Sequence, residues 1–165
     1  MKRLLIVWTS TTFGTARMVE AAYRGAVQAT GDEVAIDLEH ARDAKASHVL
    51  EADGLIFATP EHLASMAGLM KDFFERIYYP CLDKVNGKPY ALMVCAGSDG
   101  QGTIRQVERI ATGLRLKRVA EPVLVITNAQ TPDAILARKT LTAADLARCA
   151  ELGGTLAAGL QSGVF

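Results

Sequence analysis

Five short runs of apolar residues recur along the chain, and within each run the apolar positions are nearly continuous. Each run is too short for a core helix, and continuous apolar runs are typical of strands buried on both faces of a parallel sheet. We therefore expect five buried strands, at residues 4–8, 34–38, 54–58, 90–95 and 122–127.

The segments between these runs repeat their apolar residues at steps of three and four, as Met18, Ala21, Ala22 and Ala26 do. That spacing places the apolar side chains on one face of a helix. We expect a short helix near Ser47 and longer helices at 16–29, 65–78, 103–114 and 143–160, with Ser65 and Thr142 at helix starts.

The alternation of strands and helices predicts an α/β fold: a doubly wound five-stranded parallel sheet, order 2-1-3-4-5, with helices on both faces. In such sheets ligands bind beyond the carboxyl ends of the strands, where the strand order reverses. The loops after the first, third and fourth strands are therefore the candidate site. His40 and His48 are expected at the other end of the strands, and no metal site is predicted.

Composition narrows the class of protein. The chain has 165 residues, which suits a single domain over 1–165, and its 18 basic residues balance 18 acidic ones. We therefore expect no nucleic-acid or membrane partner. Three cysteines without a CxxC spacing, together with the absence of a signal-peptide pattern and of an apolar run of membrane-spanning length, indicate a cytoplasmic protein.

The loop after the first strand has the sequence WTSTTFGTAR, with five hydroxyl side chains and a glycine. A loop that runs from a buried strand into a helix directs free N–H groups and the positive end of the helix dipole at one point, which favours phosphate. Ser10, Thr12 and Thr15 add donors without adding charge. One of these hydroxyls can equally serve as a helix N-cap, but a cap explains only one of the five.

The loops after the third and fourth strands carry different chemistry. Thr59-Pro60 is expected to turn the chain off its strand, and the following Glu61 to Ala64 form a lip that suits the border of a flat ring. His62 is either a solvated loop histidine or a proton donor. The loop CAGSDGQGT, residues 95–103, has three glycines that let the backbone approach a polar heteroaromatic edge, although Asp99-Gly100 also fits an ordinary turn.

These motifs resemble those of the flavodoxin-like family of FMN-binding proteins, over essentially the whole chain. The most specific stretch is Thr59-Pro60 followed by MAGLMK, residues 66–71, which is similar to the corresponding segment of flavodoxin-fold NAD(P)H:quinone oxidoreductases of the tryptophan-repressor-binding-protein-like group. The resemblance implies an FMN-dependent oxidoreductase that takes electrons from NAD(P)H and passes them to a quinone or similar small acceptor.

The resemblance also implies roles for the loops. The first would hold the FMN phosphate, the second would flank the isoalloxazine, and the third would meet its pyrimidine edge, with His62 as the catalytic candidate. The cofactor-binding residues expected are Ser10, Thr11, Thr12, Phe13, Gly14, Thr15, Thr59, Pro60, Glu61, His62, Leu63, Ala96, Gly97, Ser98, Asp99, Gly100, Gln101 and Gly102.

Two departures keep other functions open. Phe13-Gly14 replaces the Gly-x order usual in the family's phosphate loops, and loops two and three contain no Trp or Tyr to sandwich the flavin. A flavodoxin-type electron carrier and a module that has lost FMN therefore stay as alternatives. Arg17, Arg105 and Arg109 can either meet a nicotinamide phosphate or serve as solvated helix charges, and the apolar residues of segment 66–79 allow a homo-oligomer.

Overall fold

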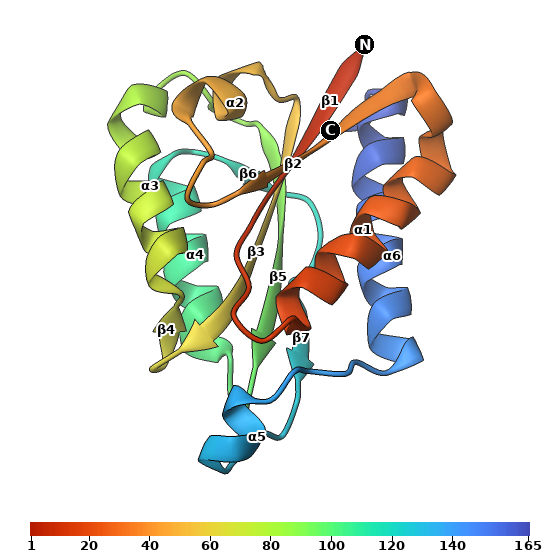
Figure 1. Ribbon diagram of the computed structural model, residues 1–165. Helices are drawn as coiled ribbons and strands as arrows, with labels where there is room; N and C mark the ends of the chain where they lie inside the picture. Colours follow the sequence, from red (N-terminus) through yellow and green to blue (C-terminus); the bar gives the residue numbers. More distant parts are fainter.

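Five parallel strands form the centre of the structure, a computed structural model that describes residues 1–165. They are β1 (Lys2–Trp8), β2 (Val34–His40), β3 (Gly54–His62), β5 (Pro89–Ala96) and β7 (Val123–Ile126). β1 lies between β2 and β3, and β5 lies between β3 and β7. This arrangement confirms the predicted α/β fold and its order 2-1-3-4-5 (Figure 1).

The sheet has seven strands and not the five predicted. β4 (Ser65–Met66) pairs antiparallel with the end of β3, and β6 (Lys117–Arg118) pairs with the start of β5. A strand of two residues has no hydrophobic period of its own, so the pattern that located the five main strands has no signal for these two.

Helices cover both faces of the sheet, as predicted. α1 (Gly14–Thr30) and α6 (Ala143–Ser162) lie on one face, and α2 (Ala46–Glu51), α3 (Gly68–Cys81) and α4 (Gln101–Gly113) lie on the other (Figure 1). The short α5 (Pro132–Leu136) projects beyond the carboxyl ends of the strands, and a 3₁₀ turn, Gly31–Glu33, follows α1.

The continuous apolar run in β1 follows from this two-sided cover. Leu5 and Val7 pack into the core under α2, α3 and α4, whereas Leu4 and Ile6 pack into the core under α1 and α6. All four side chains are essentially inaccessible to solvent. Because side chains alternate between the faces of a strand, a strand with two covered faces has no polar position left.

The close contact between α1 and α6 depends on glycines in both helices. A Cβ added at Gly153 would lie 1.9 Å from the Ala22 carbonyl oxygen, and one added at Gly25 would lie 2.0 Å from the Ala150 carbonyl oxygen. At the start of α6, Thr142 Oγ1 accepts a hydrogen bond from the Asp145 N–H at 3.1 Å, which confirms the predicted cap.

Two expectations for the chain after the third strand are wrong. Thr59-Pro60 does not turn the chain away, since β3 continues to His62, and Ser65 does not cap a helix, since it belongs to β4. The Ser65 hydroxyl instead donates to Gln106 Oε1 at 2.6 Å, and α3 begins at Gly68. Ser65 and Met66, which the helical spacing assigned to the first turn of this helix, pair instead with His62 and Glu61 at the end of β3.

The position of His40 was wrongly predicted, because His40 ends β2 opposite Trp8, at the carboxyl ends of the strands. The last residue of a parallel strand lies at the same edge of the sheet as the last residues of its neighbours. His48 lies on α2 beside Val49, whose carbonyl accepts from Lys88 Nζ next to the start of β5, and α2 covers the amino end of the sheet as expected (Figure 1).

Most apolar residues of segment 66–79 lie in the chain's own core. Met70, Phe73, Phe74 and Ile77 are buried, whereas Leu69 and Tyr79 are exposed. Core packing thus accounts for most of the pattern that suggested a homo-oligomer. No helix combines the length and the hydropathy that crossing a bilayer would require.

Candidate functional site

A cavity of about 610 Å³ opens at the carboxyl ends of the central strands, beside the point where the strand order reverses. It is lined by residues from all three predicted loops and from a fourth segment after β7. The lining residues are Ser10, Thr11, Thr12, Gly14, Thr15, Pro60, Glu61, His62, Leu63, Ala64, Cys95, Ala96, Gly97, Ser98, Thr127, Ala129, Ile135, Leu136 and Lys139.

The loop between β1 and α1 presents unpaired donors to this cavity. Ser10 Oγ accepts from the Ala16 N–H at 3.2 Å and so satisfies one donor of the first turn, whereas the N-cap position itself is Phe13, which has no capping hydroxyl. The backbone N–H groups of Thr11, Thr12, Gly14 and Thr15 find no acceptor within the chain. The Thr15 hydroxyl is buried without any hydrogen-bond partner, and the first turn of α1 contains no acidic residue. Such a set of donors matches an anion.

Gly14 allows the loop to pack closely against the end of β5. A Cβ at this position would lie 2.6 Å from Cys95 Sγ and 3.4 Å from the Lys139 Cβ atom. The sequence GT at residues 14–15 therefore places the start of α1, with its free donors, directly against the cavity wall.

Phe13, where the loop departs from the family's usual sequence, does not line the cavity. Its backbone has φ of 70°, and the Arg138 guanidinium lies 4.1 Å from the centre of its ring. The Lys139 N–H donates to the Thr12 carbonyl at 2.8 Å. Phe13 thus helps to connect the loop after β1 with the segment after β7. An exposed cation–π contact of this kind contributes about 0.5–1 kcal/mol.

Glu61 joins the second and third loops. Its carboxylate accepts from the Gly100 N–H at 3.0 Å and from the Thr103 hydroxyl at 3.1 Å, both at the start of α4. This contact holds the two loops that border the cavity at a fixed separation and places a negative charge at a helix N-terminus, where it is stabilising.

The hairpin between β3 and β4 has a strained turn at the cavity rim. Leu63 and Ala64 both have positive φ, 52° and 64°, which side chains with a Cβ rarely adopt. Leu63 is also completely exposed. A strained backbone that carries an exposed apolar side chain is a feature of ligand-contacting loops.

Six predicted cofactor residues do not line the cavity: Phe13, Thr59, Asp99, Gly100, Gln101 and Gly102. Thr59 is buried and donates its hydroxyl to the Pro60 carbonyl, and Phe13 faces Arg138. The other four belong to the turn that starts α4, whose dipeptide Asp99-Gly100 was open to that interpretation. The other twelve predicted residues line the cavity together.

The segment 127–139 was missed. Its residues Thr127, Ala129, Ile135, Leu136 and Lys139 line the cavity, and Ile135 and Leu136 are exposed at its rim. The sequence could have indicated this segment, because the loop after the fifth strand leaves the parallel sheet at the same edge as the other three loops. Thr131-Pro132 also marks a helix start, and Thr131 Oγ1 accepts from the Ala134 N–H at 3.2 Å.

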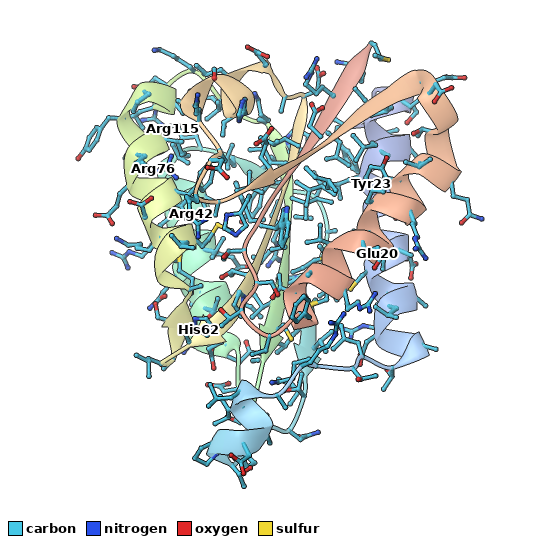
Figure 2. All side chains as sticks on the ribbon, in the orientation of Figure 1. Glu20, Tyr23, Arg42, His62, Arg76 and Arg115 are labelled. Carbon is cyan, nitrogen blue, oxygen red and sulfur yellow. The ribbon has the colours of Figure 1, made fainter.

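His62 lies at the end of the sheet that holds the cavity, near β4 (Figure 2). Partial burial lowers the pKa of its imidazole below the ordinary value of 6.5. The side chain is therefore mainly neutral near pH 7 and is charged only in more acidic solution.

Cys95 is the thiol that lines the cavity, and burial raises its pKa to about 11. Burial likewise raises the pKa of Cys149, to about 12, and that of Cys81. Because the thiolate is the reactive form, we expect none of the three to react rapidly with Ellman's reagent at pH 7.5 in the folded protein. All three should react in denaturant, and rapid labelling of one thiol under native conditions would contradict this prediction.

This chain is similar to known proteins both in sequence and in fold. The family model for NADPH-dependent FMN reductase matches residues 30–131. A flavodoxin of Aquifex aeolicus (strain VF5) is 30% identical over 102 residues, 62% of this chain and 52% of the relative, so the match spans about half of that protein's length.

Solved structures agree in fold along most of the chain. A flavodoxin from the domain Archaea has a TM-score of 0.76 at 18% identity, covering 96% of this chain and 99% of that one. A WrbA-like flavodoxin from Agrobacterium tumefaciens has a TM-score of 0.72 at 17% identity, covering 98% and 99%. These similarities and the family match, which extends over more than half of the chain, confirm the flavodoxin-like resemblance: the chain belongs to the NADPH-dependent FMN reductase family.

Proposed function

We propose that this chain is an FMN-dependent oxidoreductase that takes electrons from NAD(P)H and passes them to a quinone or a similar small acceptor. The observation that carries the proposal is a single cavity with two chemically different parts. One part has unpaired donors, including the orphaned Thr15 hydroxyl, and the other has an apolar rim formed by Leu63, Ile135 and Leu136.

The donor-rich part fits the phosphate of FMN. The family supports FMN as the cofactor, and the family match begins at residue 30, so the support for the loop after β1 comes from its structure. Four free N–H groups, the Thr15 hydroxyl and the N-terminus of α1 meet there. The nearby Lys139 ammonium is held by the Ala134, Ile135 and Ala137 carbonyls, so backbone and hydroxyl donors would bind the anion.

The other part fits a flat ring with one polar edge. The N–H groups of Gly97 and Ser98 find no acceptor within the chain and suit the carbonyl oxygens of the flavin pyrimidine. Pro60 and Leu63 on one loop and Ile135 and Leu136 on another offer apolar surface in place of the missing aromatic residues. The residues present therefore fit FMN, including both positions where the sequence departs from the family.

FMN, when bound, supplies electron transfer between a nicotinamide donor and an acceptor. The chain's residues would orient the ring, with donors near its pyrimidine edge that stabilise negative charge there. The exposed apolar rim would admit a second flat molecule against the ring, and His62 would hold a proton for the acceptor at its imidazole nitrogen.

A flavin titration followed by turnover tests the proposal. We expect purified protein to bind FMN saturably, with a change in flavin fluorescence, and the loaded protein to oxidise NADPH or NADH in the presence of a soluble benzoquinone. FMN binding without any quinone-dependent turnover would refute the enzymatic part. Failure to bind FMN would refute the whole proposal and favour a partner-binding module.

The similarity to a flavodoxin of Aquifex aeolicus supports an electron carrier as the second candidate. A carrier that docks on a charged partner benefits from a strong net charge, whereas this chain has a formal net charge of +0. A reductive titration of the FMN-loaded protein separates the two, because separate one-electron steps favour the carrier and a single two-electron step favours the enzyme.

His62 should give quinone reduction a pH dependence. The pKa of His62 is lowered from 6.5 by burial, so its protonated fraction falls as the pH rises through this lowered pKa, and turnover should fall with it. We expect His62→Gln to remove this limb and to lower turnover near pH 5.5 by about tenfold or more. The matched control is His40→Gln, because His40 ends β2 outside the cavity. A pH profile unchanged by His62→Gln would contradict the role.

A further inference from the structure

A shallow groove, widely open to solvent, runs along α4 and adjoins the cavity. Ala64 lines both, so the hairpin turn at the end of β3 separates the cavity from the groove. Arg105 and Arg109 lie on the same side of α4 as Gly102, three and seven residues further along the helix. At a rise of 1.5 Å per residue, Arg109 lies about 10 Å from Gly102 along the helix axis.

The groove holds two cations that no carboxylate neutralises. Arg105 and Arg109 are exposed and make no ion pair or hydrogen bond with the rest of the chain. The acidic residue in the groove lining, Glu108, is already bound by the Arg118 guanidinium. In contrast, Arg17 forms an ion pair with Glu20 on α1 and lies in neither the groove nor the cavity.

The wall between cavity and groove is held in place by specific contacts. Gln106 Oε1 accepts from the Ser65 hydroxyl at 2.6 Å and from the Met66 N–H at 3.4 Å, which ties β4 to α4. A Cβ at Gly102 would lie 2.7 Å from the Ala64 carbonyl oxygen, so the hairpin turn rests directly on the helix. The part of α4 that carries the two arginines is thus fixed relative to the cavity.

We propose that this groove binds the 2′-phosphate of NADPH, through Arg105 and Arg109. The inference rests on the proposed function: a dinucleotide whose nicotinamide enters the cavity must extend its adenosine half out past the rim, and the groove starts at that rim. A terminal phosphate carries close to two negative charges, and two guanidinium groups one helical turn apart can bind it from two sides. The groove would thereby select NADPH over NADH.

The test compares the two nucleotides as electron donors for the FMN-loaded protein. We expect the double variant Arg105→Gln/Arg109→Gln to raise the KM for NADPH by about tenfold or more and to change the KM for NADH by less than about twofold. The matched control Arg17→Gln should change neither. Equal changes for both donors, or no change for either, would overturn the proposal.

A binding measurement without turnover separates this inference from the proposed function. By isothermal titration calorimetry, adenosine 2′,5′-bisphosphate should bind the wild-type protein more tightly than 5′-AMP, and the double variant should lose that difference. If the bisphosphate shows this preference while quinone turnover is absent, the groove assignment stands and the enzymatic proposal fails. If turnover is present and the protein does not distinguish the two nucleotides, the groove assignment fails alone.

Discussion

Replacing Gly153 by alanine is expected to lower the free energy of unfolding by about 3 kcal/mol, because the new methyl group would overlap with the backbone of α1. The added Cβ would lie 1.9 Å from the Ala22 carbonyl oxygen, and a backbone oxygen cannot rotate away as a side-chain end can. The roughly 1 kcal/mol by which alanine favours a helix over glycine is too small to offset this overlap. Urea denaturation followed by circular dichroism measures the loss.

The neighbouring residue provides the control. A Cβ at Gly154 would lie 3.2 Å from the Gly25 carbonyl oxygen, a contact that a small shift relieves. Gly154→Ala should therefore change stability by no more than about 1 kcal/mol, with helix propensity in its favour. Gly25→Ala should behave like Gly153→Ala, because it meets the Ala150 carbonyl at 2.0 Å. Equal stability of the Gly153 and Gly154 variants would show that the two helices separate at little cost.

Much of the fold could be predicted because two-sided burial leaves a strong pattern. Each main strand is a run of apolar residues whose side chains point alternately into the cores on the two faces of the sheet, as those of Leu4 and Leu5 do. The errors came where local pairing replaced that pattern. Ser65 and Met66 have helical spacing with the residues after them, but pairing with Glu61 and His62 makes them a strand.

The candidate site could be predicted in outline from one topological rule, since the carboxyl ends of parallel strands share an edge. The rule led to the loops of Thr15 and Gly97, which line the cavity, but it applies equally to the loop after β7, which lines the cavity as well and was missed. Whether a glycine or a hydroxyl within a loop faces the ligand depends on backbone torsion and long-range contacts. Gly100 lies outside the cavity lining, and its N–H is already bound by Glu61, 39 residues away in the chain.

The structure also changes what Phe13 implies about FMN binding. From the sequence, a bulky residue in the phosphate loop was a reason to consider that FMN had been lost. With φ of 70°, Phe13 packs against Arg138 and does not line the cavity, and the backbone donors on either side of it stay free. The departure from the usual loop sequence is therefore compatible with phosphate binding.

Replacing Thr15 by valine is expected to weaken FMN binding by about 10- to 100-fold, which corresponds to one hydrogen bond to a charged group. The Thr15 side chain is 1% exposed, and its hydroxyl has no partner within the chain. Valine keeps the shape and branching of threonine, so the apo protein should be equally stable or more stable, because an unsatisfied buried hydroxyl has been removed. Fluorescence titration gives the affinity, and thermal denaturation of the apo protein gives the stability.

The combination of the two readouts makes the experiment specific to ligand binding. Thr30 is a buried threonine on the same helix whose hydroxyl donates to the Ala26 carbonyl at 3.1 Å, far along α1 from the cavity. Thr30→Val should leave FMN affinity unchanged. If Thr15→Val instead destabilised the apo protein and left FMN affinity intact, the Thr15 hydroxyl would have a structural partner and the phosphate would be bound elsewhere. Weaker binding with undiminished apo stability requires that the hydroxyl be reserved for the ligand.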